Sequence, residues 1–221
     1  MNQRFELAVY AVVRGALVGF SRLFWRLRVE GLEHVPADGP FVVSAVHRSN
    51  IDTPLVAAVT RRRLRYMGKK EMWKLRPAAW LFTTLGGFPV NRGAADREAL
   101  RTCVEVLRGG EPLVIFPEGS RRSGPVVGEI FEGAAYLSTK TGAPILPVGI
   151  GGSEAAMPIG ARMIKPVRVH LVVGPPLWPE EAAKGSRRAV REQSERLRAE
   201  LQRLFDEAQE KASGSDSARR D

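Results

Sequence analysis

The sequence predicts a single α/β domain with a mixed, largely buried sheet flanked by helices, plus an N-terminal amphipathic helix. Short apolar runs alternate with helical patterns along the chain, which is typical of this class. The chain has 221 residues, of which 44% are hydrophobic and 26% are charged, so it can bury one sizeable core. The one cysteine, Cys103, excludes an intramolecular disulfide and a cysteine-based zinc cluster, and it suits a reducing cytoplasm.

We predict a membrane-associating amphipathic helix over residues 1–28. The apolar stretch from Leu7 to Phe24 is interrupted by Arg14 and Arg22, so it is too short and too charged for a membrane span, which needs about 20 apolar residues. Basic residues beside an apolar face are typical of a helix that lies in the membrane interface. A helix packed on its own domain has the same periodicity and is the alternative. The apolar face is formed by Val9, Val12, Ala16, Phe20, Leu23 and Leu27.

The core of the domain is predicted to cover residues 29–178. Apolar runs bounded by turn residues predict strands, and a period of about 3.6 residues predicts helices. The expected strands are 41–46, 112–116, 144–150 and 167–173. The expected helices are 55–60, 96–107 and 130–140. An ion-paired surface helix is predicted over residues 179–211, followed by a polar tail over 212–221.

The positive charge of the chain is concentrated in one segment. The formal net charge is +10, and residues 61–76 hold eight basic residues against the single acid Glu71. Such an excess predicts a partner that carries phosphate, such as nucleic acid, anionic lipid or a phosphorylated metabolite. Since Trp73 and Trp80 lie in or beside this segment, we predict that both contact a membrane surface with anionic lipid. A solvated charged face is the alternative.

His47 is the histidine best placed for chemistry. It directly follows the apolar run 41–46, at the carboxyl end of a predicted strand, where open α/β sheets bind ligands. Asp52 comes five residues later, just before the predicted helix start at Thr53-Pro54. The loop between them can bring the two side chains within hydrogen-bonding reach, as a general base and the carboxylate that orients it. Asp52 as a simple helix cap is the alternative.

Two loops combine glycine with arginine. One runs from Gly86 to Arg92, and the other runs from Phe116 to Arg122. Arginine side chains beside backbone amides freed by glycine predict a phosphate site, whereas tight turns followed by solvated arginines are the alternative. The run from Pro144 to Ile150 by itself predicts only a buried strand.

In their order and spacing, these segments resemble the glycerolipid acyltransferase family, which includes lysophosphatidate and glycerol-3-phosphate acyltransferases. The four blocks of that family can be laid on His47-Arg-Ser-Asn-Ile-Asp52, Gly87-Phe-Pro-Val-Asn-Arg92, Phe116-Pro-Glu-Gly-Ser-Arg121 and Leu146-Pro-Val148. The resemblance implies that His47 and Asp52 are catalytic and that Pro147 lies on the acyl-donor side. It implies that the acceptor phosphate and head group are bound by Arg92, Glu118, Gly119, Ser120 and Arg121. It implies no metal and no cofactor, with acyl-CoA as a co-substrate.

The implied reaction moves a fatty acyl group from acyl-CoA or acyl-carrier protein to a hydroxyl of lysophosphatidate, giving phosphatidic acid in phospholipid biosynthesis. His47 would remove the hydroxyl proton while Asp52 holds the imidazole tautomer, with no covalent acyl-enzyme. A lipid acceptor implies a peripheral or monotopic protein at the cytoplasmic face of the cell membrane. Glycerol 3-phosphate or a glycolipid is the alternative acceptor.

An alternative of another class is a non-catalytic module that binds anionic lipid or nucleic acid. The net charge of +10 permits it. It gives no role to His47, Asp52 or Glu118, and the sequence has no zinc finger or aromatic RNA-binding motif. We therefore expect no nucleic-acid partner.

Overall fold

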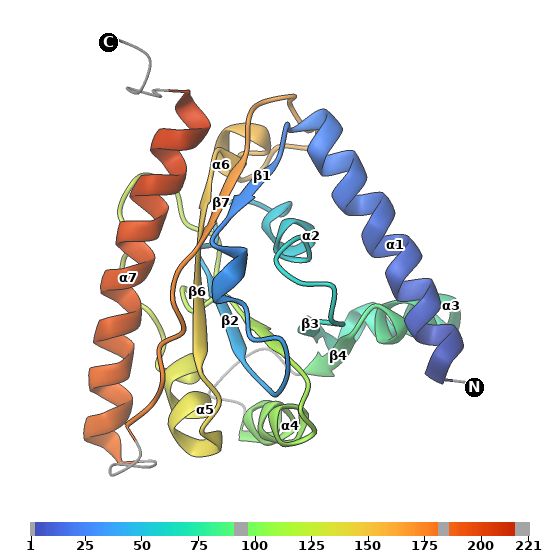
Figure 1. The fold of residues 1–221 in the computed structure, drawn as a ribbon. Helices are drawn as coiled ribbons and strands as arrows, with labels where there is room; N and C mark the ends of the chain where they lie inside the picture. Colours follow the sequence, from blue (N-terminus) through green and yellow to red (C-terminus); the bar gives the residue numbers. More distant parts are fainter. Residues whose placement is uncertain (1–2, 91–96, 181–185, 215–221) are drawn as a thin grey trace.

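The structure is a computed structural model that describes residues 3–90, 97–180 and 186–214. The described residues form a seven-stranded mixed sheet between helices, which confirms the predicted fold class (Figure 1). The strand order is β1-β7-β6-β2-β5-β3-β4, and every neighbouring pair is parallel except β6 with β7. The strands are β1 (Arg28–Glu30), β2 (Val42–Ala45), β3 (Arg65–Lys69), β4 (Gly87–Val90), β5 (Leu113–Ile115), β6 (Ile145–Gly151) and β7 (His170–Val173).

Helices cover both faces of this sheet. On one face α7 lies along β6 and β7, followed by α5 and then α4, whereas α1 and α2 lie on the other side of the sheet (Figure 1). The α-helices are α1 (Gln3–Phe24), α2 (Asp52–Val56), α3 (Arg76–Thr84), α4 (Arg97–Arg108), α5 (Gly133–Thr141), α6 (Ser153–Ala156) and α7 (Arg187–Ser213). Two short 3-10 helices are η1 (Leu32–His34) and η2 (Lys70–Trp73).

The four predicted strands are β2, β5, β6 and β7, with small shifts at their ends. The predicted helices over 96–107 and 130–140 are α4 and α5. Two predicted boundaries are wrong: α2 begins at Asp52 rather than at Leu55, and α7 begins at Arg187 rather than near residue 179. The described part of α7 also extends to Ser213, into the predicted polar tail.

The last helix touches the sheet backbone directly. A Cβ atom at Gly149 would lie 2.1 Å from the Leu204 carbonyl oxygen, and one at Gly151 would lie 2.1 Å from that of Ala208. Any side chain at these two alternate positions of β6 would therefore push α7 away. Glycine there lets the helix bury β6, all of whose residues are buried.

The carboxyl ends of the parallel strands meet at one edge of the sheet and bring distant segments together. His47 follows β2, and Phe116 to Glu118 follow β5, its hydrogen-bonded neighbour. On the other side of β2, the parallel strand β6 leads into α6. The predicted catalytic and head-group segments therefore lie beside one another at this edge.

The N-terminal helix packs on the domain along one stripe and exposes the opposite one. Tyr10, Val18 and Trp25 are buried at or just beyond α1. By length and composition, α1 is the one helix of the described chain that could cross a membrane, and 17% of its apolar window is buried. Its exposed large apolar residues are Phe5, Leu7, Val12, Leu17, Phe20 and Leu23.

Candidate active site

His47 and Asp52 form a hydrogen-bonded pair at the carboxyl end of β2. The distance between His47 Nδ1 and Asp52 Oδ2 is 3.0 Å. The loop after β2 turns back at the start of α2, so the histidine ring comes to lie over the first residue of this helix. The Asp52 side chain is fully buried, whereas 17% of the His47 side chain is exposed. An accessible imidazole backed by a buried carboxylate has the arrangement of a general base and its orienting group.

The hydrogen bonds of Asp52 determine which nitrogen of the His47 imidazole carries no proton. Its Oδ2 also accepts from the backbone N–H groups of Arg48 and Ser49, both at 2.7 Å, and these bonds fix the carboxylate in place. A carboxylate only accepts hydrogen bonds, so the proton between the two side chains belongs to His47 Nδ1. The Nε2 atom then carries the lone pair and can take a proton from an acceptor hydroxyl.

Phe116 holds the imidazole from the neighbouring strand. The two ring centroids are 4.1 Å apart and the ring planes are inclined by 22°, so the rings are stacked. Phe116 directly follows β5, which pairs with β2. The stack limits the rotation of the His47 ring and keeps Nδ1 directed at Asp52.

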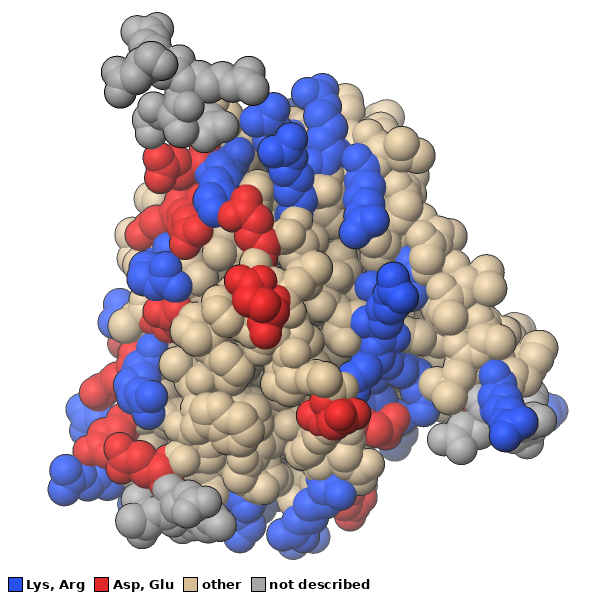
Figure 2. Space-filling model, in the orientation of Figure 1, with Lys and Arg blue, Asp and Glu red and all other residues tan. Residues whose placement is uncertain are grey.

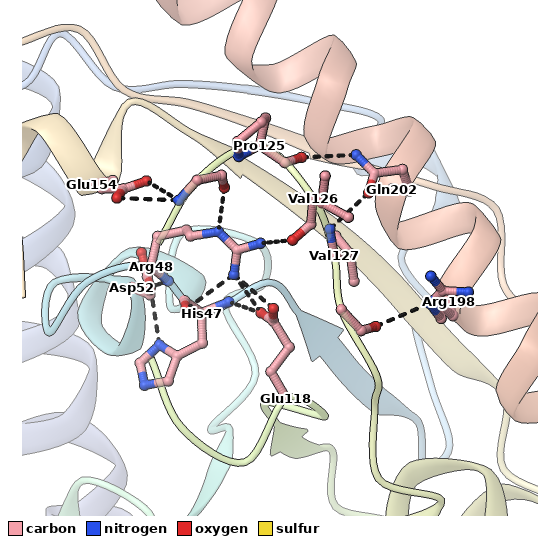
Figure 3. A network of polar contacts seen from close by, with 12 residues as sticks. His47, Arg48, Asp52, Glu118, Pro125, Val126, Val127, Glu154, Arg198 and Gln202 are labelled. Carbon is pink, nitrogen blue, oxygen red and sulfur yellow. Dashed lines mark hydrogen bonds and ion pairs between the residues drawn. The ribbon is translucent and has the colours of Figure 1, made fainter. Parts of the chain in front are cut away.

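Glu118 and Arg48 form a fully buried ion pair behind His47 (Figure 3). Arg48 Nη1 donates to both carboxylate oxygens of Glu118, at 2.7 and 2.8 Å. Glu118 Oε2 also accepts from the His47 backbone N–H at 2.8 Å. This geometry differs from the prediction that Glu118 binds the acceptor, because its carboxylate is turned into the protein and holds the His47 loop.

Arg48 also binds the segment that follows the Glu118 loop, residues 121–128, which we call the strap. Its Nε donates to the Gly124 carbonyl oxygen at 3.2 Å, and its Nη2 donates to that of Val126 at 3.1 Å. The guanidinium carbon lies 4.8 Å from the ring centroid of Phe205 in α7. Arg48 therefore joins the loop that carries His47, the strap and α7.

Other elements hold the strap at further points (Figure 3). The Gly124 N–H donates to the Glu154 carboxylate at 3.2 and 3.3 Å, and the Val127 N–H donates to Gln202 Oε1 of α7 at 2.7 Å. At the other end, the Arg122 N–H donates to the His47 carbonyl oxygen at 2.8 Å. The strap is thus connected directly to His47.

Three predicted head-group residues directly follow Glu118, and the third of them, Arg121, is the first residue of the strap. Gly119 has φ of 68°, and a Cβ there would lie 2.4 Å from the Phe131 ring, so this turn requires glycine. Ser120 is exposed and Arg121 is half-buried. Arg121 makes no ion pair with any residue that the structure describes, so its guanidinium is available for a ligand.

Arg92 and Pro147 are two further predicted site residues. Arg92 lies outside the described residues. Pro147 is buried in β6 opposite Ser44 of β2, and its carbonyl oxygen accepts from the Gly174 N–H at 2.9 Å. Its place on the acyl-donor side stays a prediction.

The predicted membrane-contact residues lie mostly on the surface. The exposed fractions are 72% for Val12, 45% for Phe20, 85% for Leu23 and 38% for Trp80. Trp73 is only half-exposed, and its indole Nε1 donates to Thr83 Oγ1 at 3.1 Å. The surface over α1, at the right of the space-filling view, consists largely of uncharged residues (Figure 2).

The basic segment 61–76 offers less free charge than the sequence predicts. Arg62 Nη2 donates to the Gly110 carbonyl oxygen at 2.8 Å, while Arg63 and Arg65 share the carboxylate of Glu111 at 3.2 and 3.1 Å. These three arginines serve the fold. The exposed cations of the segment are Arg61, Lys69, Lys70, Lys74 and Arg76.

Arg14 of α1 is likewise turned toward the protein. Its Nε donates to the carbonyl oxygens of Ala57 and Thr60, at 2.8 and 2.7 Å. This arginine fixes α1 to the end of the α2 segment, so it does not belong to a basic outer face of the helix.

A family model for acyltransferases matches residues 26–151, more than half of the chain. The chain belongs to the acyltransferase family. The matched region of this acyltransferase contains the His47–Asp52 pair, Arg48 and the segment from Glu118 to Arg121.

Similar proteins support this assignment. The 1-acyl-sn-glycerol-3-phosphate acyltransferase of Bacillus subtilis is 27% identical over 176 residues, which is 79% of this chain and 85% of the relative. A chloroplast protein of the same name from Arabidopsis thaliana is 25% identical over 163 residues, and this chain spans about half (46%) of its length. The crystal structure of the 1-acyl-sn-glycerophosphate acyltransferase of Thermotoga maritima has a TM-score of 0.73 and 26% identity, covering 99% of this chain and 83% of that one.

A metal centre and a reactive cysteine would be two other kinds of site. They contain no cluster of three or more His, Cys, Asp or Glu side chains that could hold a metal ion. Cys103 is fully buried in α4, and burial raises the pKa of its thiol to about 12, which suppresses the nucleophilic thiolate. The contacts of Arg48 and the stacking of Phe116 on His47 were not predicted from the sequence, although both residues lie within the motif blocks that resemble the acyltransferase family.

Proposed function

We propose that this acyltransferase moves a fatty acyl group from a thioester donor to a hydroxyl of lysophosphatidate, which yields phosphatidic acid. The observation that carries the proposal is the His47–Asp52 pair, whose Nδ1 and Oδ2 atoms are 3.0 Å apart. The Arg122 N–H donates to the His47 carbonyl oxygen and so connects this pair to the loop that carries Arg121. The similarity to 1-acyl-sn-glycerol-3-phosphate acyltransferases supports the same acceptor.

In the proposed mechanism, the acyl group passes directly between the two substrates. His47 Nε2 takes the proton from the acceptor hydroxyl as its oxygen attacks the thioester carbonyl carbon. Asp52 stabilises the imidazolium that forms, because its carboxylate accepts the Nδ1 hydrogen bond. The C–O bond forms, the C–S bond breaks, and the departing thiolate receives the proton from His47. No acyl-enzyme is required.

The head group of the acceptor would bind at the loop after Glu118. The Arg121 guanidinium has no internal ion pair among the described residues, and it lies two residues after the left-handed turn at Gly119. Such a combination suits a phosphate, which accepts bidentate hydrogen bonds from arginine. Arg92 is proposed as the second cation of this site.

A thiol-release assay with purified protein tests the proposal. The donors are palmitoyl-CoA and palmitoyl-carrier protein, and the acceptors are lysophosphatidate, glycerol 3-phosphate, a lyso-glycolipid and no acceptor. We expect release that depends on lysophosphatidate, with phosphatidic acid as the product by mass spectrometry. His47→Ala is the matched control and is expected to be inactive. Release without any acceptor would indicate a thioesterase, and a preference for another acceptor would reassign the substrate.

The same reaction would take place at a membrane surface, because the acceptor is a lipid whereas the donor is soluble. A peripheral or monotopic position on the cytoplasmic face, with α1 in the interface, fits the exposed apolar stripe of this helix. Val12→Gln/Leu23→Gln changes two side chains that are 72% and 85% exposed, so the fold should be retained. We expect this variant to sediment less with anionic liposomes, most clearly at high salt, where charge attraction is screened. Unchanged sedimentation at high salt would assign the anchor to another element.

A further inference from the structure

Arg48 is the largest fully buried side chain in the described part of the chain. Burying a guanidinium costs several kcal/mol unless its donors are satisfied, and a buried ion pair by itself adds little stability. In Arg48 all three nitrogens donate hydrogen bonds: Nε and Nη2 to the strap, and Nη1 to Glu118 and the His47 carbonyl. Stability by itself does not explain why Arg48 makes so many contacts. The groups that these contacts connect therefore indicate the role of Arg48.

One side of this network fixes the backbone of the catalytic histidine. The His47 N–H donates to Glu118 at 2.8 Å, and Arg48 Nη1 lies 3.3 Å from the His47 carbonyl oxygen. The Arg48 N–H itself donates to Asp52 Oδ2 at 2.7 Å. The Arg48–Glu118 pair thus holds both peptide groups of His47, while the backbone of Arg48 separately binds Asp52.

The other side of the network fixes the segment that begins at Arg121. Arg48 Nε and Nη2 bind two carbonyl oxygens of the strap, two residues apart, at Gly124 and Val126. A guanidinium is a rigid planar fork with five N–H donors, so it can bind the strap and Glu118 at the same time, which a lysine ammonium on its flexible stem cannot.

We propose that Arg48 is a positioning residue which, through Glu118, holds the catalytic base and the head-group loop in one fixed relative geometry. This inference rests on the proposed acyl transfer. It gives Glu118 a positioning role instead of contact with the acceptor. Loss of the network should reduce both turnover and acceptor binding, because it releases His47 and Arg121 together. Donor binding should change little.

Three variants test the inference. Arg48→Lys keeps the charge and removes the fork, and Glu118→Gln keeps the shape and removes the ion pair. Arg48→Met/Glu118→Leu replaces a buried pair by apolar side chains, an exchange that often leaves stability unchanged or raised. Arg198→Lys is the control, because Arg198 binds the far end of the strap through the Gly128 carbonyl at 3.0 Å and is exposed.

In each test variant we expect kcat to fall about 10²-fold, the loss typical of a misplacement near 1 Å, together with a higher KM for lysophosphatidate. In the test variants the KM for the acyl donor should stay at its wild-type value. The control variant should keep the wild-type kcat and the wild-type KM values. A folded double variant with wild-type kcat, or an Arg48→Lys protein that changes only its thermal midpoint, would overturn the proposal.

Hydrogen exchange measured by mass spectrometry gives a readout that needs no activity. We expect faster exchange over residues 121–128 in Arg48→Lys and Glu118→Gln, with unchanged exchange in β6. Unchanged protection of the strap would overturn the positioning role. If the wild-type protein transfers no acyl group, the proposed function fails, while the exchange result still decides whether Arg48 holds the strap.

Discussion

Replacing Asp52 by asparagine should remove the charge of the catalytic pair and leave its geometry in place. Asp52 Oδ2 accepts from the N–H groups of Arg48 and Ser49 at 2.7 Å, so in the variant the amide oxygen, not the NH₂ group, must occupy this position. The same oxygen faces His47 Nδ1 at 3.0 Å. The tautomer with a free Nε2 is therefore retained, and only the attraction between carboxylate and imidazolium is lost.

The size of this loss follows from the distance between the two side chains. Unit charges 3.0 Å apart attract by about 5 kcal/mol at an effective dielectric constant of about 20. If about half of the proton has moved in the transition state, about 2.5 kcal/mol is lost, which is close to 10²-fold in kcat. Removing the base itself, in His47→Ala, should cost about 10² to 10⁴-fold.

The assay is thiol release at saturating donor and lysophosphatidate, with the thermal midpoint of each variant as the folding control. Asp52→Asn should lie between the wild type and His47→Ala. Loss of less than about tenfold in kcat would refute the charge argument. A folded Asp52→Asn protein as inactive as His47→Ala would refute the retained tautomer, because it would mean that the amide had turned its NH₂ group toward the ring.

Three further predictions concern other parts of the chain. Arg121→Ala should raise the KM for lysophosphatidate about 10- to 100-fold, as expected for a lost charge-assisted hydrogen bond, and an unchanged acceptor KM would place the phosphate elsewhere. Cys103 should resist iodoacetamide in the native protein, since burial raises its thiol pKa to about 12, and rapid labelling without unfolding would contradict this. Burial lowers the pKa of His170 below its usual 6.5. The unfolded chain therefore binds a proton at His170 more readily than the folded protein does, so the free energy of unfolding should fall as the pH drops below 6.5. The thermal midpoint should decrease less on acidification in His170→Gln, and an identical decrease would exclude His170 as the cause.

The sequence predicted the His47–Asp52 pair because the two residues are close in the chain. A buried strand, a short loop and a helix start bring them near one another, and the more distant Phe116 and Glu118 then fix the histidine. The alternation of apolar runs and helical periods likewise predicted the class and the four strands richest in apolar residues. The strand β3 was not predicted because Arg65 and Lys69 interrupt its apolar pattern, and its residues are only half-buried or exposed.

The buried position of Glu118 could not be predicted because it depends on contacts that are distant in sequence. Its partner Arg48 lies 70 residues away in the chain, and a charged residue next to a catalytic histidine is more typical of a ligand-binding surface than of a core. The free charge of residues 61–76 was overestimated for the same reason. Glu111, which neutralises two of the arginines, comes from another loop.

The close approach of α7 to β6 at Gly149 and Gly151 has a consequence for the order in which the molecule is assembled. This helix supplies Gln202 to the strap and Phe205 to the guanidinium of Arg48, and it is synthesised after β2, β5 and β6. A nascent chain can pair His47 with Asp52 well before α7 exists. The contacts of α7 with the strap and with Arg48 can therefore form only after the His47–Asp52 segment has been synthesised, so a chain truncated before α7 carries these two residues without the contacts that α7 makes with the strap and Arg48.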